Sequence, residues 1–229
     1  MKNYVLTNFY LWIIIIYIED YQYGDDIMKI FIVYCHPCQD SFTFKVKEAF
    51  LKGLTDAGHS YEISDLYAMK FDPVFSESEY RREAFYSTAL PVPSDVLEEQ
   101  RKISNADIIV FIYPVFWTEC PAALTGWFQR VWTYGFAYGA DSTMKLLEKA
   151  LFLVTMGGSM SDTVRQEQIN AMKTVMVGDR IHNRAKSSEM IFFDEMTRGY
   201  GNDENRNERI RKFTEQAYHI GLTLEGEGQ

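Results

Sequence analysis

Apolar runs of strand length alternate with longer amphipathic stretches along the chain from Met28 onward. The runs are residues 29–34, 61–66, 107–113, 150–155 and 189–194. The first, third and fourth are almost continuously apolar, which is typical of parallel strands buried on both faces. Strands interleaved with helices indicate an α/β fold, with a five-stranded parallel sheet and helices on both faces.

The stretches between these runs have the spacing of amphipathic helices. One helix is expected after Ser41, a good N-cap, and a second after Ser94. Pro121 suits the first turn of a third helix, and about 15 helical residues are expected from Asp162. The last helix has an apolar stripe at Ile210, Phe213, Ala217 and Ile220.

Residues 28–229 are interpreted as a single domain, and residues 1–27 as an N-terminal extension. The apolar run at residues 4–18 is shorter than the roughly 20 residues that span a bilayer, so no stable membrane insertion is expected. No small-residue cleavage site of a signal peptide follows it. We interpret residues 1–27 as translated upstream sequence that is not part of the natural protein, which would start at Met28. Residues 70–93 are long for a connection, so we expect a functional or helical segment there.

Composition narrows the class of partner. The chain has 23 basic and 32 acidic residues, a net charge of −9, which gives no general attraction to nucleic acid or anionic lipid. A small molecule or another protein is therefore the expected partner. Three cysteines are too few, and odd in number, for a secreted disulfide framework, which favours the reducing cytoplasm.

The loop after the first strand has the character of a phosphate site. It reads CHPCQDSFTF and combines His36 with Ser41, Phe42 and Thr43 at the start of a helix. Free backbone N–H groups and the helix dipole suit an anion there, and the hydroxyls add donors. Neither a dinucleotide fingerprint nor a P-loop is present. The plainer interpretation is that Ser41 is only a helix cap and His36 only a loop residue.

Two further loops leave strands at the same end of the expected sheet, where ligands of open parallel sheets bind. Pro114 forces a turn that exposes backbone amides, and the aromatic residues that follow suit a planar, hydrogen-bonding ring. Helix core accounts for Trp127 and Trp132, but less well for Trp117 and Tyr138. The third loop, TMGGS at residues 155–159, permits close backbone approach to a ligand or simply a tight turn.

These motifs resemble those of the flavodoxin-like NAD(P)H:quinone oxidoreductases. The stretch YCHPCQDSF resembles the H-x-x-x-x-S-F loop of that family, and residues 113–139 are similar to its most recognisable segment. The resemblance covers residues 28–159 well and the remainder loosely. It implies a doubly wound flavodoxin-like sheet in the order 2-1-3-4-5, bound FAD or FMN, and a homodimer. The implied activity transfers a hydride from NAD(P)H through flavin N5 to a quinone or a similar small electrophile.

The resemblance also assigns residues to the flavin, and no metal. Those that would hold its phosphate arm are His36, Ser41, Phe42 and Thr43, where Thr43 replaces a common asparagine. Those that would line the isoalloxazine edge near N5 and O4 are Pro114, Val115, Phe116 and Trp117. Those that would approach N1 and O2 are Thr155, Met156, Gly157 and Gly158. Tyr138 would lie with Trp117 at the substrate pocket, and no side chain is assigned a catalytic role.

One departure from the family concerns the residues after the glycine pair. Mammalian-type members have a tyrosine and a histidine there, which manage the charge of the reduced flavin. This chain has SMSDTVRQEQIN, with neither residue. Arg165 is the only nearby cation in the sequence, and we hypothesise that it, or backbone amides alone, compensates.

Other functions are compatible with parts of the sequence. Cys35 and Cys38 form a C-x-x-C pair as in dithiol oxidoreductases, although Cys35 lies several residues before the expected helix start. Some relatives are flavin-containing ancillary subunits of a potassium-efflux transporter with the same motifs. A one-electron carrier of the flavodoxin type is a third alternative, against which the aromatic segment argues. The choices between FAD and FMN, and between NADH and NADPH, stay open.

Overall fold

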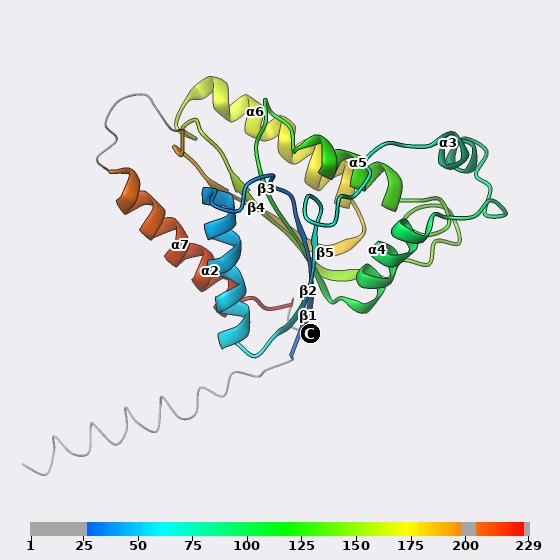
Figure 1. Ribbon diagram of the computed structural model, residues 1–229, viewed down its shortest axis with the longest axis horizontal. Helices are drawn as coiled ribbons and strands as arrows, with labels where there is room; N and C mark the ends of the chain where they lie inside the picture. The colour runs from blue at the N-terminus through cyan, green and yellow to red at the C-terminus, as the bar shows by residue number, and fades with distance from the viewer. Residues whose placement is uncertain (1–26, 198–204, 227–229) are drawn as a thin grey trace, which may run out of the picture.

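The computed structural model describes residues 27–197 and 205–226. Five strands form one parallel sheet in the order β2-β1-β3-β4-β5 (Figure 1). The strands are β1 (Lys29–Tyr34), β2 (Ser60–Asp65), β3 (Ile108–Pro114), β4 (Leu147–Thr155) and β5 (Ala185–Phe193). The predicted fold class and strand order are confirmed. Apart from Ile27, the proposed N-terminal extension lies outside the described residues and stays a prediction.

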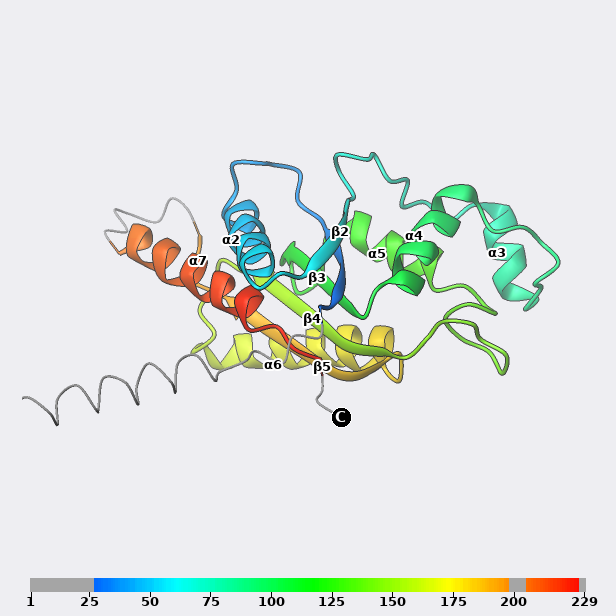
Figure 2. The ribbon, with the colours of Figure 1, turned by 90° about the horizontal axis from the view of Figure 1, so that it is seen from below.

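Helices cover both faces of the sheet (Figures 1 and 2). They are α2 (Phe42–Asp56), α3 (Glu77–Ala84), α4 (Ser94–Asn105), α5 (Ala122–Val131), α6 (Thr163–Lys173), the π-helix η1 (Thr174–Ile181) and α7 (Arg206–Leu222). Among these, α2 and α7 pack on one face, and α4, α5, α6 and η1 on the other. No helix within the described ranges is long and apolar enough to cross a membrane.

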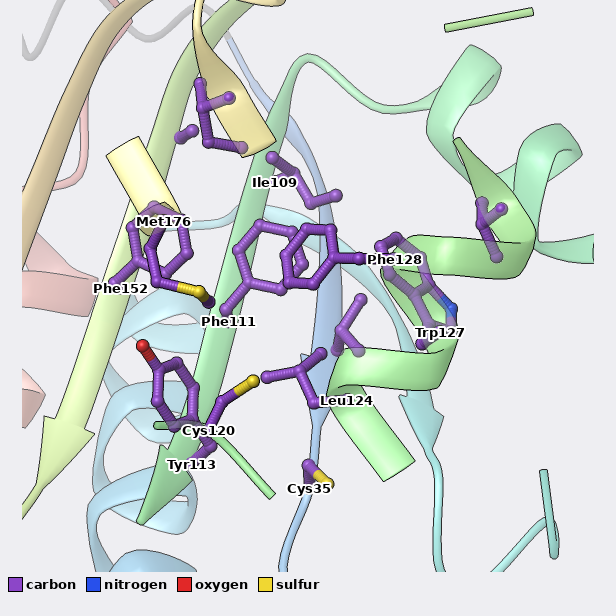
Figure 3. Close-up of a cluster of buried hydrophobic side chains, with 14 of the residues drawn as sticks. Cys35, Ile109, Phe111, Tyr113, Cys120, Leu124, Trp127, Phe128, Phe152 and Met176 are labelled. Carbon is purple, nitrogen blue, oxygen red and sulfur yellow. The ribbon is translucent and has the colours of Figure 1, made fainter. Parts of the chain in front are cut away.

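The central strand β3 shows why its sequence is continuously apolar. Ile108, Val110 and Ile112 point to the face covered by α2 and α7. The alternate residues point to the other face, where Phe111 stacks on Phe152 at 4.9 Å and meets the edge of Trp127 (Figure 3). Both faces of β3 are therefore core, as the pattern predicted.

The helices α2 and α7 touch backbone to backbone. A Cβ atom at Gly53 would lie 2.1 Å from the carbonyl oxygen of Tyr218, and one at Gly221 would lie 2.3 Å from that of Phe50. Only glycine leaves room for this approach. The contact holds α7, and with it the residues at its start, against the helix that follows β1.

The structure differs from the sequence-based expectations at several element ends. The strand β5 begins four residues earlier than predicted, because residues 185–188 alternate between half-buried and exposed and form no apolar run. The helix expected from Asp162 ends as α-helix at Lys173 and continues as the π-helix η1. Pro93 and Pro121 are the N-cap residues of α4 and α5, so Pro121 precedes the first turn and Ser94 opens its helix.

The long connection at residues 70–93 contains α3 and is fixed to α5 by one arginine. Arg130 pairs with Glu79 at 2.6 Å and with Asp95 at 2.6 Å, and donates to the carbonyl oxygen of Asp72 at 2.7 Å. The side chains of Arg130 and Glu79 are buried. The segment therefore has helical structure of its own, one of the two alternatives its length allowed.

Candidate functional site

A pocket of about 370 Å³ opens at the carboxyl ends of β1, β3 and β4. It is lined by His36, Cys38, Asp40, Ser41, Phe42, Thr43, Pro114, Val115, Thr155, Met156, Gly157, Met196 and Arg206. Nine of the twelve residues that the sequence assigned to a cofactor are in this set, and all three predicted loops contribute to it. The remaining three, Phe116, Trp117 and Gly158, lie outside it.

The start of α2 presents free hydrogen-bond donors to the pocket. Ser41 is the N-cap, and its Oγ accepts from the backbone N–H of Phe44 at 3.0 Å. The backbone N–H groups of Phe42 and Thr43 bond to no other described residue. Because the helix dipole adds positive potential at this end, the site suits a phosphate.

His36 adds a donor that is fixed in one tautomer. The backbone N–H of Cys38 donates to His36 Nδ1 at 2.9 Å, so the neutral ring carries its proton on Nε2. Burial is the largest influence on this imidazole and lowers its pKa below the ordinary value. Neutral His36 can therefore offer an Nε2–H to a ligand oxygen in the pocket.

Two threonine hydroxyls join the walls of the pocket. Thr43 Oγ1 and Thr155 Oγ1 are 2.7 Å apart, and both residues are buried. This hydrogen bond ties the first turn of α2 to the end of β4. The Thr43 hydroxyl therefore has a hydrogen-bond partner inside the chain.

Arg206, the first residue of α7, brings a cation to the same pocket. Its Nε is buried and has no hydrogen-bond partner among the described residues. Sequence reasoning missed Arg206, because it follows no motif and lies far along the chain from the first loop. The apolar stripe of α7 predicted this helix but not the residue at which it begins, so it did not indicate that Arg206 lies at the pocket.

The aromatic residues after β3 form a tight hairpin beside the pocket. Phe116 and Glu119 exchange backbone hydrogen bonds of 2.9 and 3.1 Å. Trp117 and Thr118 at its tip have φ of 61° and 109°, a conformation that costs a β-branched residue energy. Trp117 is 97% exposed. The predicted role of Trp117 against a bound ring is not tested by this geometry and stays a prediction.

The two glycines of the TMGGS loop are covered by different neighbours. A Cβ at Gly157 would lie 2.3 Å from Thr197 Oγ1, and a Cβ at Gly158 would lie 2.9 Å from Arg165 Nε. The space that a side chain would occupy at each glycine is therefore filled by another side chain of the same protein. Arg165 lies against the glycine pair, as its hypothesised role requires, and that role remains a prediction.

Tyr138 lies away from the pocket of its own chain. Its hydroxyl donates to Glu83 Oε2 at 2.7 Å, and burial, then this carboxylate, raise the pKa of Tyr138 well above its ordinary value. The adjacent carbonyl of Ala137 accepts from Arg184, just before β5, at 2.9 Å. The Tyr138 loop therefore lies at the amino ends of β4 and β5, whereas the pocket lies at carboxyl ends.

The paired cysteines have opposite environments. Cys35 is buried among apolar side chains (Figure 3), and burial raises the pKa of its thiol to about 12. Cys38 is exposed at the pocket, and both thiols are free. A buried, protonated first cysteine is unsuited to dithiol exchange, which needs an accessible thiolate. Within the described ranges, no three or more His, Cys, Asp or Glu residues are grouped to hold a metal.

Comparison with known proteins places this geometry among relatives. A family model described as "Flavodoxin-like fold" matches residues 28–216. The structure of an NAD(P)H:quinone oxidoreductase from Methanothermobacter marburgensis is similar, with a TM-score of 0.78 and 38% sequence identity. That match covers 88% of this chain and 99% of the other.

Two curated mammalian proteins are similar over part of their length. NAD(P)H dehydrogenase [quinone] 1 of Cavia porcellus is 36% identical over 148 residues, and ribosyldihydronicotinamide dehydrogenase [quinone] of Mus musculus is 35% identical over 150 residues. The matches cover 57% of this chain in each case. The chain spans 54% and 64% of the length of these two relatives.

Proposed function

Because the chain belongs to the flavodoxin-like fold family, we propose that it is a flavin-dependent NAD(P)H oxidoreductase that reduces a quinone or similar electrophile. The observation that carries this proposal is the pocket at the carboxyl edge of the sheet. Nine residues that the sequence assigned to a flavin meet there, together with the cation Arg206. Identity of 38% to a quinone oxidoreductase that this chain covers almost completely supports the proposed reaction.

The phosphate arm of the flavin would be held at the start of α2. The free N–H groups of Phe42 and Thr43, the Ser41 hydroxyl and His36 Nε2 are neutral donors, and Arg206 supplies charge. FMN and FAD share the phosphate that follows the ribityl chain, so this subsite suits either cofactor. The choice between the two cofactors remains open in the proposal.

The ring of the flavin would lie against the loops that leave β3 and β4. A bound flavin supplies the hydride acceptor and donor of the reaction. The protein's part is to orient the ring. Pro114 has no N–H, and the N–H groups of Val115 and Phe116 are hydrogen-bonded within the chain, so the N–H of Trp117 is the one in this stretch that would be offered to one edge of the ring. Residues 155–157 would approach the other edge. Exposed Phe116 and Trp117 would shield the site from water once an acceptor or NAD(P)H stacks there.

We further propose that the chain acts as a homodimer in the cytoplasm. Tyr138 lies at the opposite end of the sheet from the pocket of its own chain, so a role at the substrate site requires a second copy. Phe85 and Tyr86, which follow α3, and Trp117 are all well exposed, and a second copy would cover them. Sedimentation at micromolar concentration checks this proposal, and a monomer would contradict it.

The activity is tested with purified protein, NADH or NADPH, and a soluble naphthoquinone. We expect nicotinamide oxidation that depends on both the quinone and the flavin. The variant Cys38→Ser should retain the wild-type rate within about twofold, because the hydride path uses no thiol. Loss of the activity in Cys38→Ser with flavin still bound would favour the dithiol alternative. Flavin binding without any quinone-dependent oxidation would contradict the proposed reaction.

A further inference from the structure

The hairpin after β3 has a backbone conformation that its sequence does not favour. Phe116 and Glu119 close it with two backbone hydrogen bonds, so Trp117 and Thr118 form a two-residue turn. The angle φ is positive at both turn residues, 61° at Trp117 and 109° at Thr118. Turns of this kind normally contain Asn-Gly, because bulky and β-branched residues are strained at positive φ. Contacts elsewhere in the chain must therefore stabilise the hairpin.

One arginine of the π-helix η1 contacts the end of this hairpin. Arg180 Nη1 donates to Glu119 Oε1 at 3.4 Å and to Cys120 Sγ at 3.3 Å. The same Glu119 oxygen accepts from the backbone N–H of Cys120 at 3.0 Å, which fixes the carboxylate to the hairpin end. The Arg180 side chain is 13% exposed, and its guanidinium lies 4.9 Å from the ring centroid of Phe128. Arg180 thus lies between the hairpin and the core that contains Phe128 and Cys120 (Figure 3).

The backbone of Arg180 is fixed as well as its side chain. Trp132 Nε1 donates to the carbonyl oxygen of Arg180 at 2.6 Å. Trp132 directly follows α5, and Phe128 belongs to that helix, so both ends of the arginine are held against the same part of the fold. A π-helix is rare and is frequently found at functional sites. An arginine held in this way can resist relaxation of the hairpin.

The amide at the tip of the hairpin is free to bind a ligand. The N–H of Val115 donates to the carbonyl oxygen of Thr155, and that of Phe116 bonds within the hairpin. The N–H of Trp117 bonds to no other described residue. We propose that Arg180 is a positioning residue, which holds the hairpin in the strained conformation that presents the Trp117 N–H to the flavin ring. This inference rests on the proposed function, since it needs a flavin ring beside the hairpin.

The test measures riboflavin and FMN binding by fluorescence titration of full-chain variants. Arg180→Ala should weaken both ligands equally, roughly 3- to 10-fold, the usual effect of one hydrogen bond, because the two ligands share the ring. Arg180 does not line the pocket, so no loss specific to the phosphate is expected. The matched control is Arg101→Ala, an arginine that pairs with Glu62 and Glu98 instead of the hairpin, which should bind both ligands as wild type does.

A glycine in the turn separates positioning from a purely structural role of Arg180. Glycine adopts positive φ without strain, so with Thr118→Gly the hairpin no longer depends on Arg180. In the Arg180→Ala background, Thr118→Gly should restore both affinities to within about twofold of wild type. It would not restore packing lost on Phe128. If Arg180→Ala does not fold, Glu119→Ala removes the same contact at a half-exposed side chain, with the same expected losses and the same rescue.

The expected result is an equal loss for the two ligands that Thr118→Gly reverses. Unchanged riboflavin affinity in Arg180→Ala would overturn the inference, as would a loss confined to FMN or one that Thr118→Gly does not reverse. Wild-type protein that binds neither flavin would overturn the proposed function itself, a result distinguishable from failure of this inference alone.

Discussion

Replacing Gly221 with alanine should destabilise the protein by about 3 kcal/mol or more, at the upper end of what overpacking costs. The new Cβ would lie 2.3 Å from the carbonyl oxygen of Phe50 and 3.0 Å from the backbone nitrogen of Leu54. Both atoms belong to the backbone of α2, so no side-chain rotation relieves the contact. The helices α2 and α7 must separate along their whole contact, and a domain of ordinary stability has only about 5–15 kcal/mol to lose.

Denaturant unfolding measures the effect of Gly221→Ala, with Gly178→Ala as the matched control. The nearest atom to a Cβ at Gly178 is 4.0 Å away, and its φ is not positive. The control should therefore unfold within about 0.5 kcal/mol of wild type or slightly later. Equal unfolding midpoints for the two variants would show that α2 and α7 do not pack as closely as described.

Reversing the charge of Arg206 should reduce FMN affinity by about 100-fold, because a hydrogen-bonded cation at a phosphate becomes a repelling carboxylate. Arg206 lines the same pocket as His36 and Ser41, and its Nε is buried without a described partner. Riboflavin has no phosphate, so its affinity for Arg206→Glu should change much less. Fluorescence titration with the two ligands gives this ratio directly.

Arg211→Glu is the control for Arg206→Glu. Arg211 is on the same helix but exposed and outside the pocket, so its reversal changes the net charge equally without touching the ligand. Its FMN affinity should stay within about threefold of wild type, since exposed charges are screened by salt. Comparable losses in the two variants, or an equal loss for riboflavin, would contradict the placement of the phosphate beside Arg206.

Much of the fold could be predicted because its strands are buried on both faces. A run such as residues 108–113 is apolar throughout, since α2 and α7 cover one face and α4 and α5 the other. The start of β5 could not be predicted, because its first four residues pair through their backbone but form no apolar run, and Lys186 and Ser188 are exposed. The π-helix η1 was also missed, since its amphipathic spacing does not differ recognisably from that of an α-helix.

The candidate site was predictable where its residues adjoin a strand end. Ser41 and Gly157 follow β1 and β4, and Pro114 ends β3, so the topology alone brings them to one edge. Arg206 is brought to the pocket by the packing of α7 on α2. No short sequence motif indicates this packing, so Arg206 could not be predicted. For Tyr138 the reverse is true. The aromatic segment that contains it is recognisable in the sequence, but the fold places Tyr138 at the opposite end of the sheet from the pocket.

Flavin binding at the pocket, through the flavin's phosphate, underlies the proposed function. The most direct measurement is the absorption spectrum of the purified full chain, before and after addition of flavin, followed by release and mass determination of the bound molecule. We expect a yellow protein with one flavin per chain, and a released mass equal to that of FMN or FAD. A colourless protein that takes up no added flavin would contradict flavin binding at this pocket.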